Sequence, residues 1–190
     1  MGMADGDRFH PETIGDWHDW LAANHDRGDG VWVVLGRAVS GNPRLGYEEL
    51  IREALCWGWV DGQSKPLDEL RSMLWFTKRK PNSPWAASNK ARVAELERAG
   101  RLQPSGIAEI DRAKANGNWT ILDSVEALQE PAELAGALDA APAARIAWDA
   151  FPASVRKMAL GSIALAKQDT TRARRIAQIV EKAARGERPV

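Results

Sequence analysis

The apolar positions in the first half of the chain switch between helical and strand-like spacing. Between residues 13 and 28 they recur every three or four positions, and Thr13 and Asp16 stand where a helix N-terminus would lie. This pattern predicts an amphipathic helix that ends before Gly28. Residues 31–35 read Val-Trp-Val-Val-Leu, a β-branched and aromatic run that predicts a buried strand.

A second helix and two further strands follow from the same kind of pattern. Residues 40–43, Ser-Gly-Asn-Pro, predict a turn, and the apolar stripe over residues 47–55 predicts a helix that packs by one face and stops at Gly58. Residues 59–62 and 71–77 each predict a short strand. Together these elements predict a small, mainly antiparallel sheet with helices packed against it.

The pattern beyond the sheet is helical only. Ile107 and Ile110 mark one helix that ends near Gly117, and further helices begin at single prolines or cap residues. These later start positions are Pro131, Pro142, Ser154 and Asp169. We therefore expect an α+β fold, with a mixed segment over residues 1–103 and a helical segment over residues 104–190 that packs on it as one compact unit.

The composition indicates a large hydrophobic core and fits a reducing compartment. A chain of 190 residues with 44% hydrophobic residues has enough apolar surface for a sizeable core. Nine tryptophans stand beside one tyrosine, and we expect most of the tryptophans to be buried. Cys56 is the single cysteine, which excludes an internal disulfide and any metal site built from several cysteines, and fits a reducing compartment.

The N-terminal sequence and the length of the apolar runs bear on location. The first eight residues are polar and acidic and lead into no apolar run of signal-peptide length. No run of about 18 consecutive apolar residues occurs anywhere, which argues against a membrane-spanning helix. We therefore expect a cytoplasmic protein.

A net charge of zero conceals four alternating blocks. Residues 1–64 hold 5 basic and 11 acidic side chains, whereas residues 65–103 hold 9 and 4. Residues 104–144 hold 2 basic and 7 acidic side chains, whereas residues 145–190 hold 10 and 4. If the two basic blocks share a face, the molecule attracts an anionic partner; if they do not, these are ordinary solvated surfaces.

Two internal blocks and one stretch near the end of the chain resemble a known family. Residues 54–63 read ALCWGWVDGQ, residues 76–90 read FTKRKPNSPWAASNK, and residues 166–176 read AKQDTTRARRI. In these blocks the chain resembles the YdeI/OmpD-associated proteins, which are named for protection against bacteriocins, and the resemblance runs over most of the chain. It implies a protective or stress-resistance protein and supplies no reaction. The family's Pro-Arg after Phe-Thr is here Lys78-Arg79, so no role that needs a rigid turn is carried over.

The second block contains the strongest candidate binding site. Ser83 followed by Pro84 predicts a helix start, and three basic residues precede it, so the helix dipole and the side chains together favour an anion such as phosphate. The predicted ligand-binding residues are Lys78, Arg79, Lys80, Ser83, Trp85 and Asn89. In the structural alternative, Ser83 caps its own helix, Trp85 packs into the core and the basic residues are solvated.

A second basic cluster lies near the end of the chain. Arg172 and Arg175 share a helix face, and the apolar residues that follow predict that the helix docks by its other side. This cluster is either an ordinary basic surface or a contact for a polyanion, nucleic acid included.

Two further residues are candidates for chemistry. Cys56 lacks a visible base and lies in an apolar stretch, so we expect a buried structural thiol rather than a nucleophile. Asp61 is the best isolated carboxylate for acid–base work, although an Asp-Gly pair is more often a turn. His18 and His25 are seven positions apart, too far for one metal on a helix, and we expect neither a metal nor a cofactor.

Three functions fit these observations. We favour a non-enzymatic protective protein that binds a phosphate-bearing molecule or polyanion through the basic helix start. The first alternative is a small enzyme with a pocket near Trp57 and Trp59 that uses Asp61 as acid or base. The second is a structural protein that associates with itself through the charged blocks.

Overall fold

The computed structural model describes residues 6–36 and 45–189, so the turn predicted at residues 40–43 lies outside the described residues. The chain forms two compact units, Met1–Gly117 and Asn118–Val190. Each unit is built around its own buried residues and is described by itself.

The first unit contains the sheet. Its elements are β1 (Arg8–Phe9), α1 (Ile14–Asn24), β2 (Val31–Gly36), α2 (Tyr47–Cys56), β3 (Trp59–Pro66), β4 (Arg71–Lys78), α3 (Ala87–Arg98) and α4 (Pro104–Ala115). The strand order is β1-β2-β4-β3, in which β1 runs parallel to β2 and the other pairs are antiparallel. The predicted α+β fold, with a small, mainly antiparallel sheet and a helical second half, is confirmed; β1, only two residues long, was not predicted.

Local sequence signals set the ends of the first helices. Thr13 accepts a hydrogen bond from the Asp16 N–H, and the Asp16 carboxylate accepts one from the Thr13 N–H, which forms a capping box at the start of α1. Gly58 follows α2 with φ of +78°, a left-handed conformation that suits glycine, as predicted for the stop of that helix. Helix α1 ends at Asn24, earlier than Gly28.

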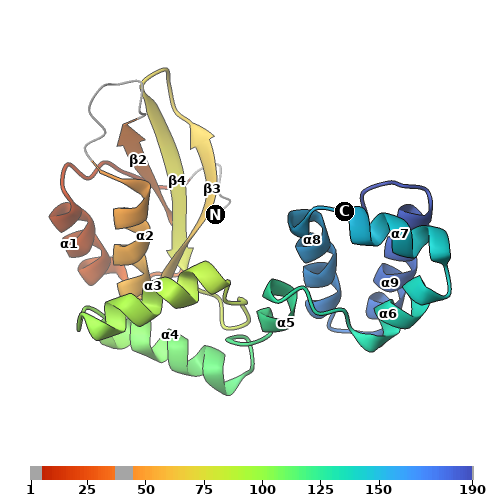
Figure 1. Cartoon of the computed structure of the whole chain (residues 1–190). Helices are drawn as coiled ribbons and strands as arrows, with labels where there is room; N and C mark the ends of the chain where they lie inside the picture. The colour runs from red at the N-terminus through yellow and green to blue at the C-terminus, as the bar shows by residue number, and fades with distance from the viewer. Residues whose placement is uncertain (1–5, 37–44, 190) are drawn as a thin grey trace. The chain divides into compact units, whose positions relative to one another are not determined.

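One face of the sheet packs against helices. Val31 lies opposite Phe76 and Val33 opposite Leu74, so these four side chains share a face, and the Phe76 ring lies 5.1 Å from the ring of Trp17 in α1. Figure 1 shows α1 and α2 beside this sheet, and α2 contacts α1, β3, α3 and α4. This arrangement brings the start of α2, the strand β3 and the start of α3 into one region.

The start of α3 differs from the prediction. The helix begins at Ala87, with Ala86 as its N-cap in extended backbone, rather than at Ser83 and Pro84. The Ser83 N–H instead donates to the Lys80 carbonyl in a turn. The Pro84 carbonyl accepts a hydrogen bond from Arg79, which holds this segment outside the helix. The predicted end, near Ala99 with Gly100 as the stop, is confirmed.

Helix α4 lies beyond the segment boundary predicted at residue 103, yet it packs within the first unit. The Gln103 N–H donates to the Cys56 carbonyl, and the Ser105 hydroxyl donates to the Trp57 carbonyl, each at 3.0 Å. Gly106 lies directly against the Cys56 carbonyl. The end of α2 is therefore held by the start of α4.

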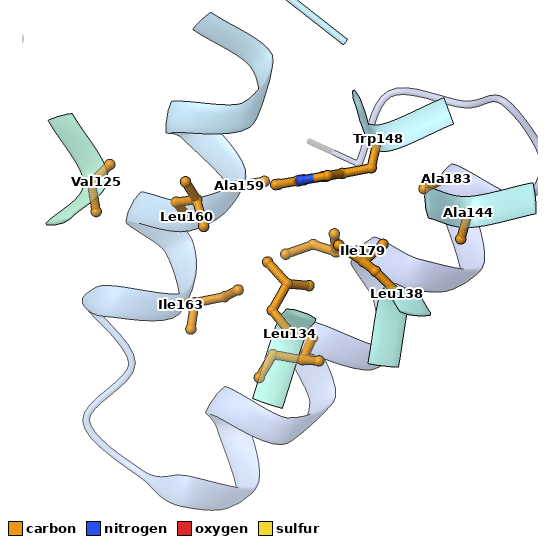
Figure 2. Packing of buried hydrophobic residues seen from close by; sticks show 11 residues of the cluster. Val125, Leu134, Leu138, Ala144, Trp148, Ala159, Leu160, Ile163, Ile179 and Ala183 are labelled. Carbon is orange, nitrogen blue, oxygen red and sulfur yellow. The ribbon is translucent and has the colours of Figure 1, made fainter. Parts of the chain in front are cut away.

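The second unit is a helical bundle. Its elements are α5 (Asp123–Glu126), α6 (Ala132–Asp139), α7 (Pro142–Ala150), α8 (Ala153–Ala164) and α9 (Asp169–Ala184). Figure 2 shows the indole of Trp148 extending from α7 toward Ala159 of α8, beside Ile179 of α9. The Trp148 side chain is completely buried, and its Nε1 donates to Glu130 at 2.7 Å.

The helices of the second unit follow the predicted starts closely. Those expected at Pro131, Pro142, Ser154 and Asp169 are confirmed to within one residue. The short helix α5 was not predicted, since four residues carry no readable period. Within residues 6–36 and 45–189, no helix is long and apolar enough to cross a membrane.

Candidate functional site

Arg79 is the centre of the candidate site. The sheet positions this residue, because Arg79 follows β4 directly and its N–H donates to the Gly58 carbonyl at 3.0 Å. Its guanidinium stacks on the ring of Trp85, with Cζ 3.8 Å from the ring centroid, and Nη2 donates to the Pro84 carbonyl at 2.6 Å. The charge therefore lies at the segment that leads into α3.

The Arg79 guanidinium is buried with part of its hydrogen-bonding capacity unmatched. The residue is only 4% exposed, and its Nε and Nη1 atoms make no hydrogen bond. Burial lowers the pKa of Arg79 to about 10, while the nearby carboxylates of Glu109 and Asp61 oppose that shift. At neutral pH this group is a buried cation whose Nε and Nη1 donors have no acceptor.

Asp61 and Tyr47 form the second part of the site. The Tyr47 hydroxyl donates to Asp61 Oδ2 at 2.9 Å, which connects the first residue of α2 to β3. Burial and then the Asp61 carboxylate raise the pKa of Tyr47. The predicted acid–base role of Asp61 stays a prediction, and the turn expected at Asp61 and Gly62 is instead part of β3.

Arg92 joins the start of α2 to the start of α3. Its guanidinium donates to both oxygens of Glu48, at 2.9 and 2.8 Å, and to Asn89 Oδ1 at 2.9 Å. The hydrogen bond from Arg92 is the main cause of the lowered pKa of Glu48. Arg92 also lies within electrostatic range of Tyr47 and Asp61, so the two parts of the site share a charge environment.

The other predicted ligand-binding residues lie in different surroundings. Lys78 Nζ donates to Asp26 Oδ1 at 3.0 Å, so its charge is matched by a carboxylate beyond α1. Lys80 is exposed, and Ser83 lies in a turn before the helix. The structure thus brings Arg79, Trp85 and, through Arg92, Asn89 to the start of α3; ligand binding by the full set stays a prediction.

The alternating charge blocks pair with each other inside each unit. In the first unit the basic block supplies Lys78, Arg92 and Arg101 to carboxylates of the acidic block before it. In the second unit the partners of the acidic block are Arg145, Lys157 and Arg172. Ion pairs within each unit therefore match part of the charge of these blocks, and self-association through them stays a prediction.

The second predicted basic cluster has partners within its own unit. Arg172 Nη2 lies 3.4 Å from Glu133 Oε2, and Arg175 Nη1 donates to the Ser162 carbonyl. These contacts connect α9 to α6 and α8. Contact of this cluster with a polyanion stays a prediction.

Trp57 and Trp59 take part in packing. Trp59 is fully buried and its Nε1 donates to the His25 carbonyl at 3.0 Å. Trp57 is half-buried, and its Nε1 donates to Glu53 Oε1 at 3.2 Å. Glu53 is itself buried and also accepts from His18 and Arg101. A pocket for chemistry beside these two tryptophans stays a prediction.

Cys56 lies in the core, as expected for a structural thiol. The residue is buried at the end of α2, and its Sγ donates to the Arg52 carbonyl at 3.3 Å. Burial, with a smaller contribution from Glu53, raises the pKa of the Cys56 thiol from 9.0 to about 11. The neutral thiol is therefore the form that the folded protein favours.

We expect Cys56 to react with Ellman's reagent about 100-fold more slowly in the folded protein than in urea-unfolded chain at pH 8, because the raised pKa depletes the thiolate. The stabilisation linked to the neutral thiol is present below the unfolded-state pKa and is lost as pH rises through about 11. Cys56→Ser protein gives the blank rate. Equal rates for the folded and unfolded chains would contradict the assignment of Cys56 as a buried, neutral thiol.

The sequence pattern does not identify two residues of the site and places a third wrongly. The apolar stripe over residues 47–55 predicts a packed position for Tyr47, yet this residue is 52% exposed. Glu109 and Arg92 lie in no recognisable motif, and each interacts with a residue far from it in the sequence. The one available signal was that Tyr47 is the single tyrosine among nine tryptophans, at the polar first turn of a helix.

Two family models match the chain. The family described as Domain of unknown function (DUF8412) matches residues 9–109, and the family described as Bacteriocin-protection, YdeI or OmpD-Associated matches residues 127–186. No curated protein and no solved structure matches the chain. The expected resemblance is thus confirmed over residues 127–186, which include residues 166–176, but not over most of the chain. Residues 54–63 and 76–90 fall in the other match.

Proposed function

We propose that this chain, which belongs to the family described as Domain of unknown function (DUF8412), is a non-enzymatic binding protein that holds a small oxyanion, phosphate or carboxylate, at Arg79. The match of the second unit to the bacteriocin-protection family supports a protective role for the whole protein. The observation that carries the binding proposal is the buried guanidinium with two unmatched donor atoms.

The energetics of Arg79 support a binding role beside its structural contacts with Pro84 and Trp85. A buried charge whose N–H groups lack acceptors lowers the free energy of unfolding, because desolvation is not repaid by hydrogen bonds. A ligand oxyanion supplies both the missing acceptors and the opposite charge, and guanidinium groups bind such oxygens in pairs. Residues that oppose stability in this way are common at functional sites.

The ligand reaches Arg79 through the segment between Arg79 and α3. Nε and Nη1 lie below the surface, so binding requires residues 80–86 to shift, and this segment contains no helix or strand. Trp85 lies in it and stacks on the guanidinium, so a shift changes the surroundings of the indole. Ligand binding is therefore expected to change tryptophan fluorescence.

A fluorescence titration tests the proposal. Wild-type protein is titrated with inorganic phosphate and with acetate at low and high salt, alongside Arg79→Met and Arg98→Met. Arg98 is the matched control because it is exposed, lies at the far end of α3 and removes the same charge. We expect saturable, salt-weakened binding in the wild type and in Arg98→Met, with at least about a tenfold loss in Arg79→Met.

Two results would overturn the proposal. One is the absence of saturable binding of either anion to the wild type. The other is equal affinity in Arg79→Met and the wild type, since the bound anion would then lie elsewhere. Equal losses in Arg79→Met and Arg98→Met would also count against it, because they would reflect overall charge rather than a site.

A further inference from the structure

Tyr47 is the one aromatic side chain that the protein leaves largely exposed. All 13 aromatic residues lie within the described part of the chain, and the other 12 are buried or half-buried. Tyr47 is 52% exposed. An exposed ring is a surface on which another planar ring can stack, and such contacts are favourable beyond the area that they bury.

The Tyr47 ring is also fixed at both ends. Tyr47 is the first residue of α2, which restrains its backbone, and its hydroxyl donates to Asp61 Oδ2 on β3 at 2.9 Å. A side chain restrained in this way loses little rotamer freedom when a ligand packs on it, so more of the contact energy appears as affinity. The hydrogen bond leaves the ring accessible while holding its position.

Asp61 links this ring to the Arg79 site. The Arg79 N–H donates to the carbonyl of Gly58, which directly precedes β3, so the backbone brings Asp61 of β3 near Arg79. The Asp61 carboxylate accepts from the Tyr47 hydroxyl and lies within electrostatic range of Arg92. Arg92 in turn contacts Asn89 in the first turn of α3. The exposed ring and the buried cation with unmatched donors are therefore parts of one region of the first unit.

We infer that the anion bound at Arg79 carries a planar ring, which stacks on Tyr47. The ligand class is a phosphate- or carboxylate-bearing aromatic molecule, with the anion at Arg79 and the ring at the start of α2. This inference rests on the proposed function, because it assigns the ligand of the same site. Tyr47 is then a specificity-determining residue, and Asp61 is a positioning residue that acts through it.

Calorimetric titrations with phenyl phosphate and ethyl phosphate test the inference, since the two share a phosphate and differ in the ring. We expect phenyl phosphate to bind the wild type about tenfold more tightly. Tyr47→Leu is expected to lose that preference, so that the two phosphates bind this variant with equal affinity. Tyr47→Phe, which keeps the ring and loses the hydroxyl, is expected to lie between them.

The outcomes separate this inference from the proposal beneath it. Equal binding of the two phosphates by the wild type would overturn the ring assignment and leave the oxyanion site in place. A preference for phenyl phosphate that survives in Tyr47→Leu would also overturn it. Binding of neither phosphate by the wild type would overturn the oxyanion site itself. Circular dichroism of each variant checks that the exposed Tyr47 is not needed for folding.

Discussion

Replacing Gly106 by alanine is expected to lower the free energy of unfolding of the first unit by at least about 3 kcal/mol. A Cβ at this position would lie 2.1 Å from the Cys56 carbonyl oxygen and 2.8 Å from its carbon, and both are backbone atoms that cannot swing away. Helix α4 would have to move, which breaks the hydrogen bonds from Gln103 and Ser105. Urea denaturation followed by circular dichroism measures the loss.

Gly136→Ala is the matched control for this prediction. Gly136 also lies inside a helix, α6, but a Cβ there would meet nothing within 4 Å. Alanine is the better helix former, so this variant is expected to gain up to about 1 kcal/mol. If Gly106→Ala were as stable as the wild type, that result would contradict the close packing of α4 against the end of α2.

Truncating Trp148 to alanine is expected to lower the free energy of unfolding of the second unit by about 4 kcal/mol. The side chain is completely buried among residues of α6, α8 and α9, so its removal leaves a large cavity (Figure 2). It also removes the hydrogen bond from Nε1 to Glu130, a carboxylate whose pKa is lowered mainly by Arg145. Thermal and urea denaturation measure the effect.

Ile146→Ala provides the comparison within the same helix. Ile146 is 73% exposed, so its truncation is expected to change the free energy of unfolding by less than about 0.5 kcal/mol. Trp148→Phe keeps most of the buried ring, so the decrease in its free energy of unfolding should lie between those two values. Equal effects of Trp148→Ala and Ile146→Ala would contradict the assigned core of the second unit.

The elements that the sequence predicted well are those whose ends carry a local chemical signal. Thr13 with Asp16, Gly58 and Gly100 are cap or stop residues whose roles depend only on their neighbours, and all three boundaries were confirmed. The strand at residues 31–35 was found for a similar reason, since β-branched and aromatic residues between glycines are specific to buried strands.

The start of α3 shows where local signals fail. Ser83 and Pro84 are a favourable pair for a helix start, but the side chain of Arg79, the residue after β4, decided the outcome. Arg79 binds the Pro84 carbonyl and stacks on Trp85, so the helix begins only after Ala86. Nothing in the spacing of residues 76–90 could reveal that the arginine turns inward.

The candidate site was therefore predicted in part. Arg79, Trp85 and Asp61 were named from the sequence, and the structure gathers them near the start of α3 and β3. Tyr47 was misjudged and Glu109 was missed, because both reach the site only through the packing of α2 and α4. Lys78 was named for its charge, yet Asp26, distant in sequence, matches that charge.

The most direct test of the account is the free energy of unfolding of the wild type and Arg79→Met, each without ligand and with excess inorganic phosphate. Without ligand we expect the free energy of unfolding of Arg79→Met to be within about 1 kcal/mol of the wild-type value or above it. The loss of the contacts with Pro84 and Trp85 is offset by the removal of a buried charge with two unmatched donor atoms. With phosphate, only the wild type should gain stability. A large loss of stability in Arg79→Met without ligand, together with the same response to phosphate in both proteins, would contradict the account and make Arg79 a structural residue.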